Sequence, residues 1–225
     1  MSWLETSINK SKKLKDHYKL RGVDIFIKDA LDEDIDFDFV VRYVSVRLPD
    51  HLLRNVDIIY VGKFQDLIDR EVNAMYEHGA IYILNQQDSE MDIIDDLIHE
   101  IAHSNELKYQ EIIYGDKTLE REFLAKRKAL FNILKRENEK YTIPISFTVD
   151  SSHRQEVDDF LYRDVTYSTL WQMIPGIFPS PYAATSLREY FARGFEEYFM
   201  GKKEALKDIC PVLYSKMRDL ENVED

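Results

Sequence analysis

Residues 99–103 carry the clearest chemical signal in the chain, because they read His-Glu-Ile-Ala-His, the pattern H-E-x-x-H. In an α-helix, residues four apart lie on one face, one above the other. His99 and His103 can therefore direct two imidazole nitrogens at one metal ion, and the pattern indicates Zn²⁺. Glu100 can then act as the general base on a metal-activated water molecule. The motif predicts zinc-dependent hydrolysis.

The sequence around the motif favours a helix that begins near Ser89 and directs its histidines away from its apolar side. With about 100° between successive residues, the apolar side chains share one arc of the helix, and His99 and His103 fall on the opposite edge. The alternative is a histidine pair that only packs, in a helical module that binds no metal. The apolar arc contains Ile94, Leu97, Ile98, Ile101 and Ala102.

Four carboxylates lie near the histidine stripe of this helix. Asp92, Asp95 and Asp96 precede the histidines by one or two turns, and Glu106 follows His103 on the next turn. Acidic residues in the first turns stabilise a helix through its dipole. Any of the four could instead accept a hydrogen bond from a metal-bound imidazole.

A catalytic zinc ion needs a third protein ligand, since two histidines leave its coordination incomplete. No other histidine follows at the six-residue spacing that some zincins use, so we expect a carboxylate from a later helix. Glu189 is the candidate, and Glu196 on the same stripe and His153 are the reserves. The alternative for Glu189 is structural, because Ser186 and Glu189 have the S-x-x-E spacing of a capping box.

HEIAH followed by E-Y-F-A-x-x-F at residues 189–195 resembles the gluzincin metallopeptidases, in particular the anthrax lethal factor-like group and the small minigluzincins. The resemblance implies that Glu189 is the third zinc ligand. It also implies that Tyr182, seven residues earlier, assists catalysis, and its hydroxyl could donate to the oxyanion. The segment Pro211–Tyr214 resembles the P-x-h-aromatic stretch that follows the glutamate helix in such proteins. For Tyr182 the alternative is plain packing.

The resemblance covers residues 55–103 and 182–220. The 85 residues between His103 and Glu189 form a longer insertion than the compact members have. The expected fold is therefore α+β and zincin-like: a small mixed sheet with an edge strand above the H-E-x-x-H helix, plus a C-terminal helix that carries the glutamate. The expected domains are an N-terminal appendage at 1–50 and a metallopeptidase domain at 51–225, with a helical insertion at about 107–175.

Local sequence patterns predict the elements that position these residues. Alternating β-branched and aromatic residues indicate strands, whereas apolar spacing of three and four indicates helices. The strand at 80–84 precedes the motif helix and is the expected edge strand, against which a peptide would lie antiparallel. The alternative for this strand is an ordinary buried strand, and its apolar content fits both. Strands are expected at 23–27, 37–46, 55–61 and 80–84, and helices at 1–20, 66–77, 117–138 and 186–200.

We expect a zinc-dependent peptidase, of the endopeptidase type, acting on a peptide or protein substrate. The alternative is a metallopeptidase fold that serves as a binding or assembly component of a larger particle, with a masked or unused site, because fold alone does not fix function. The segments at 1–50 and 107–175 could then be docking surfaces.

Composition excludes several other classes of function. The 225 residues carry a net charge of −12 and no basic stripe interleaved with aromatic residues, so no nucleic-acid partner is expected. No apolar run reaches the roughly 18 residues that span a membrane. The single cysteine excludes an internal disulfide framework. With no secretory signal, the expected location is cytoplasmic, including membership of a larger particle.

Overall fold

The computed structural model describes residues 17–223, which form a five-stranded mixed sheet and a set of helices. The predicted α+β class is confirmed. Contacts divide the chain into two units, one that ends at Asn105 and one that begins at Glu106. This division lies at a different position from the boundary predicted near residue 50. Among the described residues, no helix is both long enough and apolar enough to cross a membrane.

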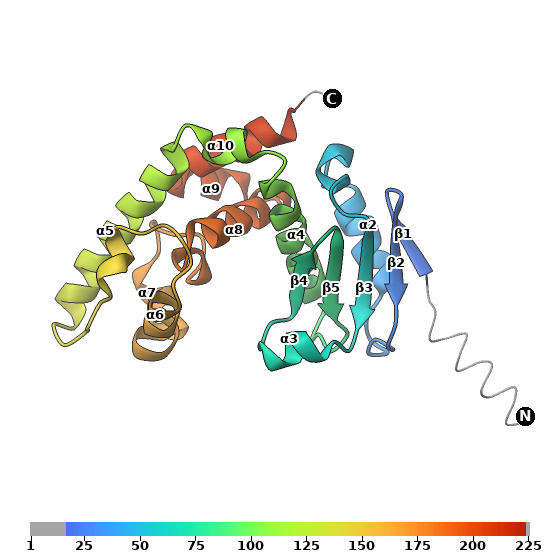
Figure 1. Cartoon of the computed structure of the whole chain (residues 1–225), viewed down its shortest axis with the longest axis horizontal. Coiled ribbons are helices and arrows are strands. Elements are labelled where there is room, and N and C mark those ends of the chain that lie inside the picture. Colours follow the sequence, from blue (N-terminus) through green and yellow to red (C-terminus); the bar gives the residue numbers. More distant parts are fainter. Residues whose placement is uncertain (1–16, 224–225) are drawn as a thin grey trace, which may run out of the picture. The chain divides into compact units, whose positions relative to one another are not determined.

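The first unit contains the sheet, whose strands run in the order β1-β2-β3-β5-β4 (Figure 1). The three central strands β2, β3 and β5 are parallel, and the outer strands β1 and β4 are each antiparallel to their neighbour. The strands are β1 (His17–Leu20), β2 (Val23–Ile27), β3 (Ile58–Gly62), β4 (Ala74–Glu77) and β5 (Ala80–Leu84).

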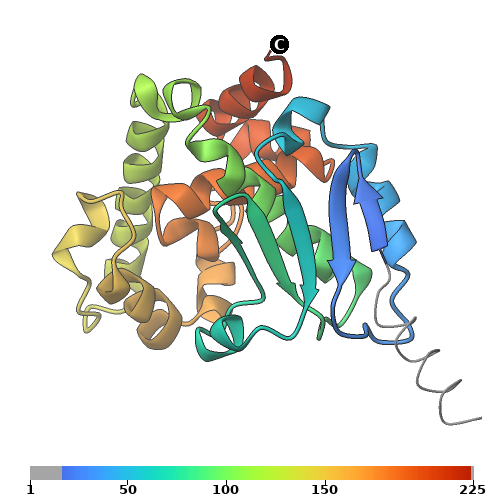
Figure 2. The same cartoon turned by 45° about the vertical axis from the view of Figure 1, so that its right-hand side comes forward.

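One face of this sheet is covered by helices α2 (Phe37–Ser45) and α4 (Glu90–Glu106), as Figure 2 shows. Side chains alternate between the faces of a strand, so the residues on the covered face are the buried ones. The short helices η1 (Asp50–Leu53) and α3 (Gln65–Asp69) complete the connections. The apolar sheet residues with no exposed surface are Leu20, Ile25, Ile59, Val61, Ile81 and Ile83.

The strand predicted at 37–46 is wrong, because this segment forms helix α2. Asp36 caps the helix by accepting a hydrogen bond from the N–H of Phe39 at 3.1 Å. The buried positions Phe37, Val40 and Val44 have helical spacing. Burial of this stripe overrides the β-propensity of the valines and aromatic residues.

Two helix predictions in the first unit are wrong in part. The helix expected at 66–77 is helical only as far as Asp69, within α3 (Gln65–Asp69), and Ala74–Glu77 forms strand β4 instead. A two-residue turn joins β4 to β5, with positive φ at both His78 and Gly79. Of the helix expected at 1–20, residues 17–20 form strand β1, and residues 1–16 lie outside the described part of the chain.

The second unit is helical, and its central helix is α8 (Leu187–Phe199), which contacts α5, α9 and α10 (Figure 1). Eight of the 13 residues of α8 are buried, because apolar residues occupy most of its circumference. The helix predicted at 117–138 is confirmed as α5. The other elements are η2 (Glu111–Gly115), α5 (Thr118–Glu137), η3 (Ile145–Thr148), α6 (Gln155–Asp159), η4 (Phe160–Val165), α7 (Tyr167–Met173), η5 (Tyr182–Ala184), α9 (Lys203–Ile209) and α10 (Pro211–Glu221).

Gly194 permits the close packing of α10 against α8. A Cβ atom at this position would lie 2.3 Å from Cδ2 of the fully buried Leu213. We expect Gly194→Ala to lower the free energy of unfolding by about 1–3 kcal/mol, because overpacking forces the core to shift. Urea unfolding measures this change.

Leu213→Ala supplies the control for this clash, because it removes the atoms that the new methyl group would meet. The double variant should therefore lose less stability than the sum of the two single losses. A Gly194→Ala protein as stable as the wild type would contradict the packing argument.

Candidate metal centre

Helix α4 begins with a local cap at Ser89. The Ser89 hydroxyl lies 3.3 Å from the backbone N–H of Asp92 and 2.8 Å from its carboxylate. One turn later, the Asp96 carboxylate accepts from the side-chain amide of Gln87 at 2.8 Å. Asp92 therefore helps to start the helix, and both carboxylates have a donor other than an imidazole.

The apolar side of α4 is buried, and this orients the motif. Leu97, Ile98 and Ile101 are at most 1% exposed, whereas His99 and His103 are partly exposed. The separation between apolar residues and histidines follows the arc that the sequence predicts.

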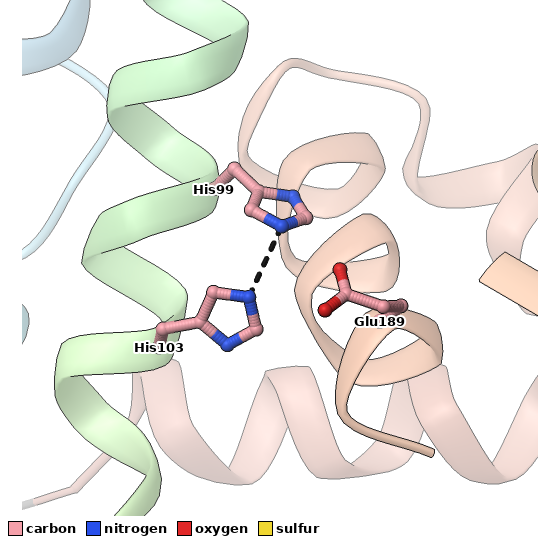
Figure 3. Close-up of side chains that lie close together, drawn as sticks. All are labelled: His99, His103 and Glu189. Carbon is pink, nitrogen blue, oxygen red and sulfur yellow. Dashed lines mark hydrogen bonds between the residues drawn. The ribbon is translucent and has the colours of Figure 1, made fainter. Parts of the chain in front are cut away.

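The two imidazoles lie at a separation that suits a shared metal ion. Their Nε2 atoms are 3.1 Å apart, and Figure 3 shows both rings directed toward the carboxylate of Glu189. Two nitrogens that are each about 2.0–2.1 Å from one tetrahedral zinc ion lie roughly 3.3 Å apart. The histidine geometry therefore fits zinc without rearrangement of the helix.

Glu189 joins the two histidines in the one group of three possible metal ligands among residues 17–223. One ligand atom from each of His99, His103 and Glu189 lies within 4.8 Å of the others. Two imidazoles and a carboxylate are a donor set found in catalytic zinc sites. The arrangement can hold one divalent cation, and nothing in it selects zinc over similar metals by geometry alone.

The start of α8 explains how Glu189 is presented. Ser186 is the N-cap, and its hydroxyl accepts from the backbone N–H of Glu189 at 3.2 Å. This bond is one half of the predicted capping box. The Glu189 carboxylate belongs to the group with the histidines, so the cap uses the backbone of this residue and leaves its carboxylate available as a possible metal ligand.

Glu100 is buried and is held by strand β4. Its Oε2 accepts from the backbone N–H of Tyr76 at 2.6 Å, and the residue is 8% exposed. The two-residue turn makes Glu77 and Ala80 a hydrogen-bonded pair, so the N–H of Tyr76 points away from β5. The free edge of β4 thus orients the candidate general base.

The predicted edge strand needs correction. Ala80–Leu84 is β5, which has β3 on one side and β4 on the other, so it is interior. The edge strand next to β5 is β4, in the segment for which the sequence predicted a helix, and β1 forms the other edge. The outward peptide groups of this outer strand, Ala74–Glu77, belong to Ala74 and Tyr76.

Tyr182 lies in η5, seven residues before Glu189 in the same unit. Burial raises the pKa of its hydroxyl above the usual value, and the negative charge of Glu189 raises it further. The guanidinium carbon of Arg193 is 5.7 Å from the centre of the ring. The hydroxyl is therefore protonated at neutral pH and can donate a hydrogen bond.

The reserve ligands Glu196 and His153, and Glu106, the expected acceptor for a metal-bound imidazole, have other surroundings. The Glu196 carboxylate is buried and accepts from Nη1 of Arg193 at 2.6 Å. Glu106 accepts from Nε of Arg188 and from the hydroxyl of Tyr114, each at 3.0 Å. His153 is exposed. None of these three residues belongs to the group of possible metal ligands.

Tyr167 and Asp158 were not singled out from the sequence, although the structure places them near Tyr182. The charges of both groups contribute to the raised pKa of Tyr182. The Tyr167 hydroxyl lies 3.5 Å from the Asp158 carboxylate. Tyr167 is one of 14 tyrosines, and the sequence does not distinguish it from the others, because the insertion that contains it matches no motif.

No protein family model, curated protein or solved structure matches this chain.

Proposed function

We propose that this chain is a zinc-dependent peptidase, of the endopeptidase type, with a zincin-like fold and a gluzincin ligand set. The observation that carries the proposal is the group formed by His99, His103 and Glu189, whose ligand atoms lie within 4.8 Å of one another. Zinc is the metal that this donor set and the H-E-x-x-H pattern favour. Three protein ligands leave one coordination position for water or substrate.

In this proposal, zinc supplies Lewis acidity, which polarises the scissile carbonyl and lowers the pKa of the attacking water. Glu100 takes the proton of that water and later delivers it to the leaving amine. The N–H of Tyr76 keeps the Glu100 carboxylate in one orientation throughout. The hydroxyl of Tyr182 donates to the developing oxyanion.

The sheet supports a peptide as the substrate. Strand β4 is an outer strand, and the outward peptide groups of Ala74 can pair with an extended chain. Such pairing binds backbone atoms and gives affinity with little dependence on sequence. Because Glu100 bonds to the neighbouring residue Tyr76, a peptide on this edge would lie close to the general base.

The third ligand is tested by Glu189→Ala beside the matched variant Glu196→Ala. Glu196 is on the same helix and has Arg193 as a partner, so it isolates the metal ligand from general effects of lost charge. We expect about one zinc ion per wild-type chain. Zinc affinity should be weaker by about 10–100-fold or more in Glu189→Ala, since loss of a residue that only hydrogen-bonds to a metal ligand already has an effect of that size. Mass spectrometry of protein purified without chelator measures the metal.

Two results would overturn parts of this proposal. A loss of zinc in Glu196→Ala but not in Glu189→Ala would transfer the third ligand to Glu196. A wild-type chain that binds zinc but cleaves nothing in a digest of a peptide library would refute the peptidase and favour the assembly component.

A further inference from the structure

Arg127 is a fully buried cation on the apolar stripe of helix α5. Its exposure is 0%, and its guanidinium lies beside two aromatic rings, 4.6 Å from the centre of Phe123 and 5.1 Å from that of Phe147. Burial lowers the pKa of Arg127 to about 10, so the group is still charged at neutral pH. Its neighbours on the stripe are Leu119, Phe123, Leu130 and Leu134.

The donors of Arg127 are directed at backbone carbonyls of two loop segments. Nε donates to the carbonyl of Ala184 at 2.9 Å, and Nη2 donates to that of Thr185. Nη1 donates to the carbonyls of Phe147 at 3.2 Å and Asp150 at 2.8 Å. A buried charge is tolerated only when its donors are satisfied, and here the backbone satisfies them.

The first segment joins the two site residues of this unit. Ala184 ends η5, which begins at Tyr182, and Thr185 precedes the cap of the helix that carries Glu189. The Thr185 N–H and hydroxyl both donate to the Tyr182 carbonyl, at 3.0 Å and 2.8 Å. Arg127 therefore holds the middle of the turn whose ends are Tyr182 and Glu189.

The second segment supports the same junction from the other side. The carbonyl of Ser151, next to Asp150, accepts from the N–H of Leu187 at 2.8 Å. The Ser151 hydroxyl donates to Glu120 on α5 at 2.6 Å. The insertion thus forms the base on which the start of α8 rests, and Arg127 connects its parts.

We propose that Arg127 is a positioning residue that fixes Tyr182 and Glu189 relative to each other, so that Glu189 is presented as a ligand and Tyr182 as a donor. The proposal rests on the proposed zinc peptidase. Lysine cannot replace arginine in this role, because a single ammonium lacks the planar fork that reaches carbonyls on two segments at once.

The test compares Arg127→Lys with Lys216→Met. Lys216 is also a buried cation of this unit, but its amine bonds to the Ile112 carbonyl and the Asp116 carboxylate, away from the junction. We expect Arg127→Lys to speed amide hydrogen exchange in residues 182–189 by about 10-fold or more and to weaken zinc affinity by roughly 10-fold. Lys216→Met should leave both the amide exchange of residues 182–189 and the zinc affinity within about 2-fold of the wild-type values.

A second, milder variant is Phe147→Leu, which removes one ring beside the guanidinium and leaves every donor in place. It should shift exchange and zinc affinity in the same direction by roughly 3-fold, which keeps the test available if Arg127→Lys does not fold. Tyr182→Phe should lower kcat by a smaller factor in the Arg127→Lys protein than in the wild-type protein. The reason is that a Tyr182 hydroxyl already displaced by Arg127→Lys no longer contributes to kcat.

The outcomes separate the two proposals. If the wild-type protein binds no zinc, the proposed function fails, whatever the exchange data show. If the wild-type protein binds zinc but the Arg127 and Phe147 variants keep wild-type exchange and zinc affinity, the positioning role of Arg127 is refuted and the peptidase stands.

Discussion

Glu100→Gln is expected to lower kcat by about 10²–10⁴-fold while the protein keeps its zinc, because a general base contributes a factor of this size. Glutamine has nearly the same shape as glutamate but cannot take a proton from water. Its side-chain oxygen can still accept from the N–H of Tyr76, which bonds to Glu100 at 2.6 Å in the native protein. The local structure should therefore survive, and only the proton transfer is lost.

Glu90→Gln is the matched control on the same helix. The Glu90 carboxylate also accepts a backbone N–H, that of Asp36 at 3.0 Å, but it lies at the start of α4, two turns before the motif. We expect its kcat to stay within about 3-fold of the wild type, as for most substitutions away from a site. Steady-state kinetics and zinc content, measured on both variants, distinguish the loss of the general base from a general effect of replacing a carboxylate on α4. Unchanged turnover in Glu100→Gln would remove the general base from the mechanism.

The helices that carry the candidate ligands could be predicted because their signals are local. The apolar arc around HEIAH and the Ser186 cap each lie within one helix, so a short window of sequence contains them. Glu189 is different, since 85 residues separate it from His103. The lack of a suitably spaced histidine made Glu189 a candidate and the resemblance supported it, and in the structure one of its carboxylate oxygens lies within 4.8 Å of a nitrogen of each imidazole.

The errors in the fold have long-range causes. Residues 37–46 carry β-branched side chains that favour a strand, but the buried stripe of α2 decides the structure. Strand β4 depends on pairing with β5 through a His78–Gly79 turn, and histidine with positive φ is not a usual turn signal. The edge that holds Glu100 therefore could not be located from the sequence.

Arg127 shows a partial signal that sequence analysis could have used. A cation at position 127 interrupts an apolar stripe with spacing of three and four, which marks it as a buried charge in need of partners. The sequence cannot name those partners, because they are backbone carbonyls up to 58 residues away. Every residue has a backbone carbonyl, so the partners of such a side chain have no characteristic residue type that a sequence could reveal.

Removal of zinc is expected to lower the free energy of unfolding by about 3–4 kcal/mol. This value applies to a protein that was first saturated with free zinc at roughly 100–1,000 times the Kd. The unfolded chain scatters the three ligands, so binding stabilises the folded state. For a chain of this size, the melting midpoint should fall by about 6–16 °C. Thermal unfolding with added zinc and with a chelator measures the difference.

His103→Ala should show one melting midpoint in both conditions, because zinc no longer distinguishes folded from unfolded chains. His153→Ala, which removes an exposed histidine outside the ligand group, should keep the full difference. Protons compete with the metal for imidazole nitrogens, so the stabilisation by zinc must shrink as the pH falls. Equal midpoints for the wild-type protein with zinc and with chelator would show that these three side chains hold no metal, because a ligand that binds only the folded state must stabilise it.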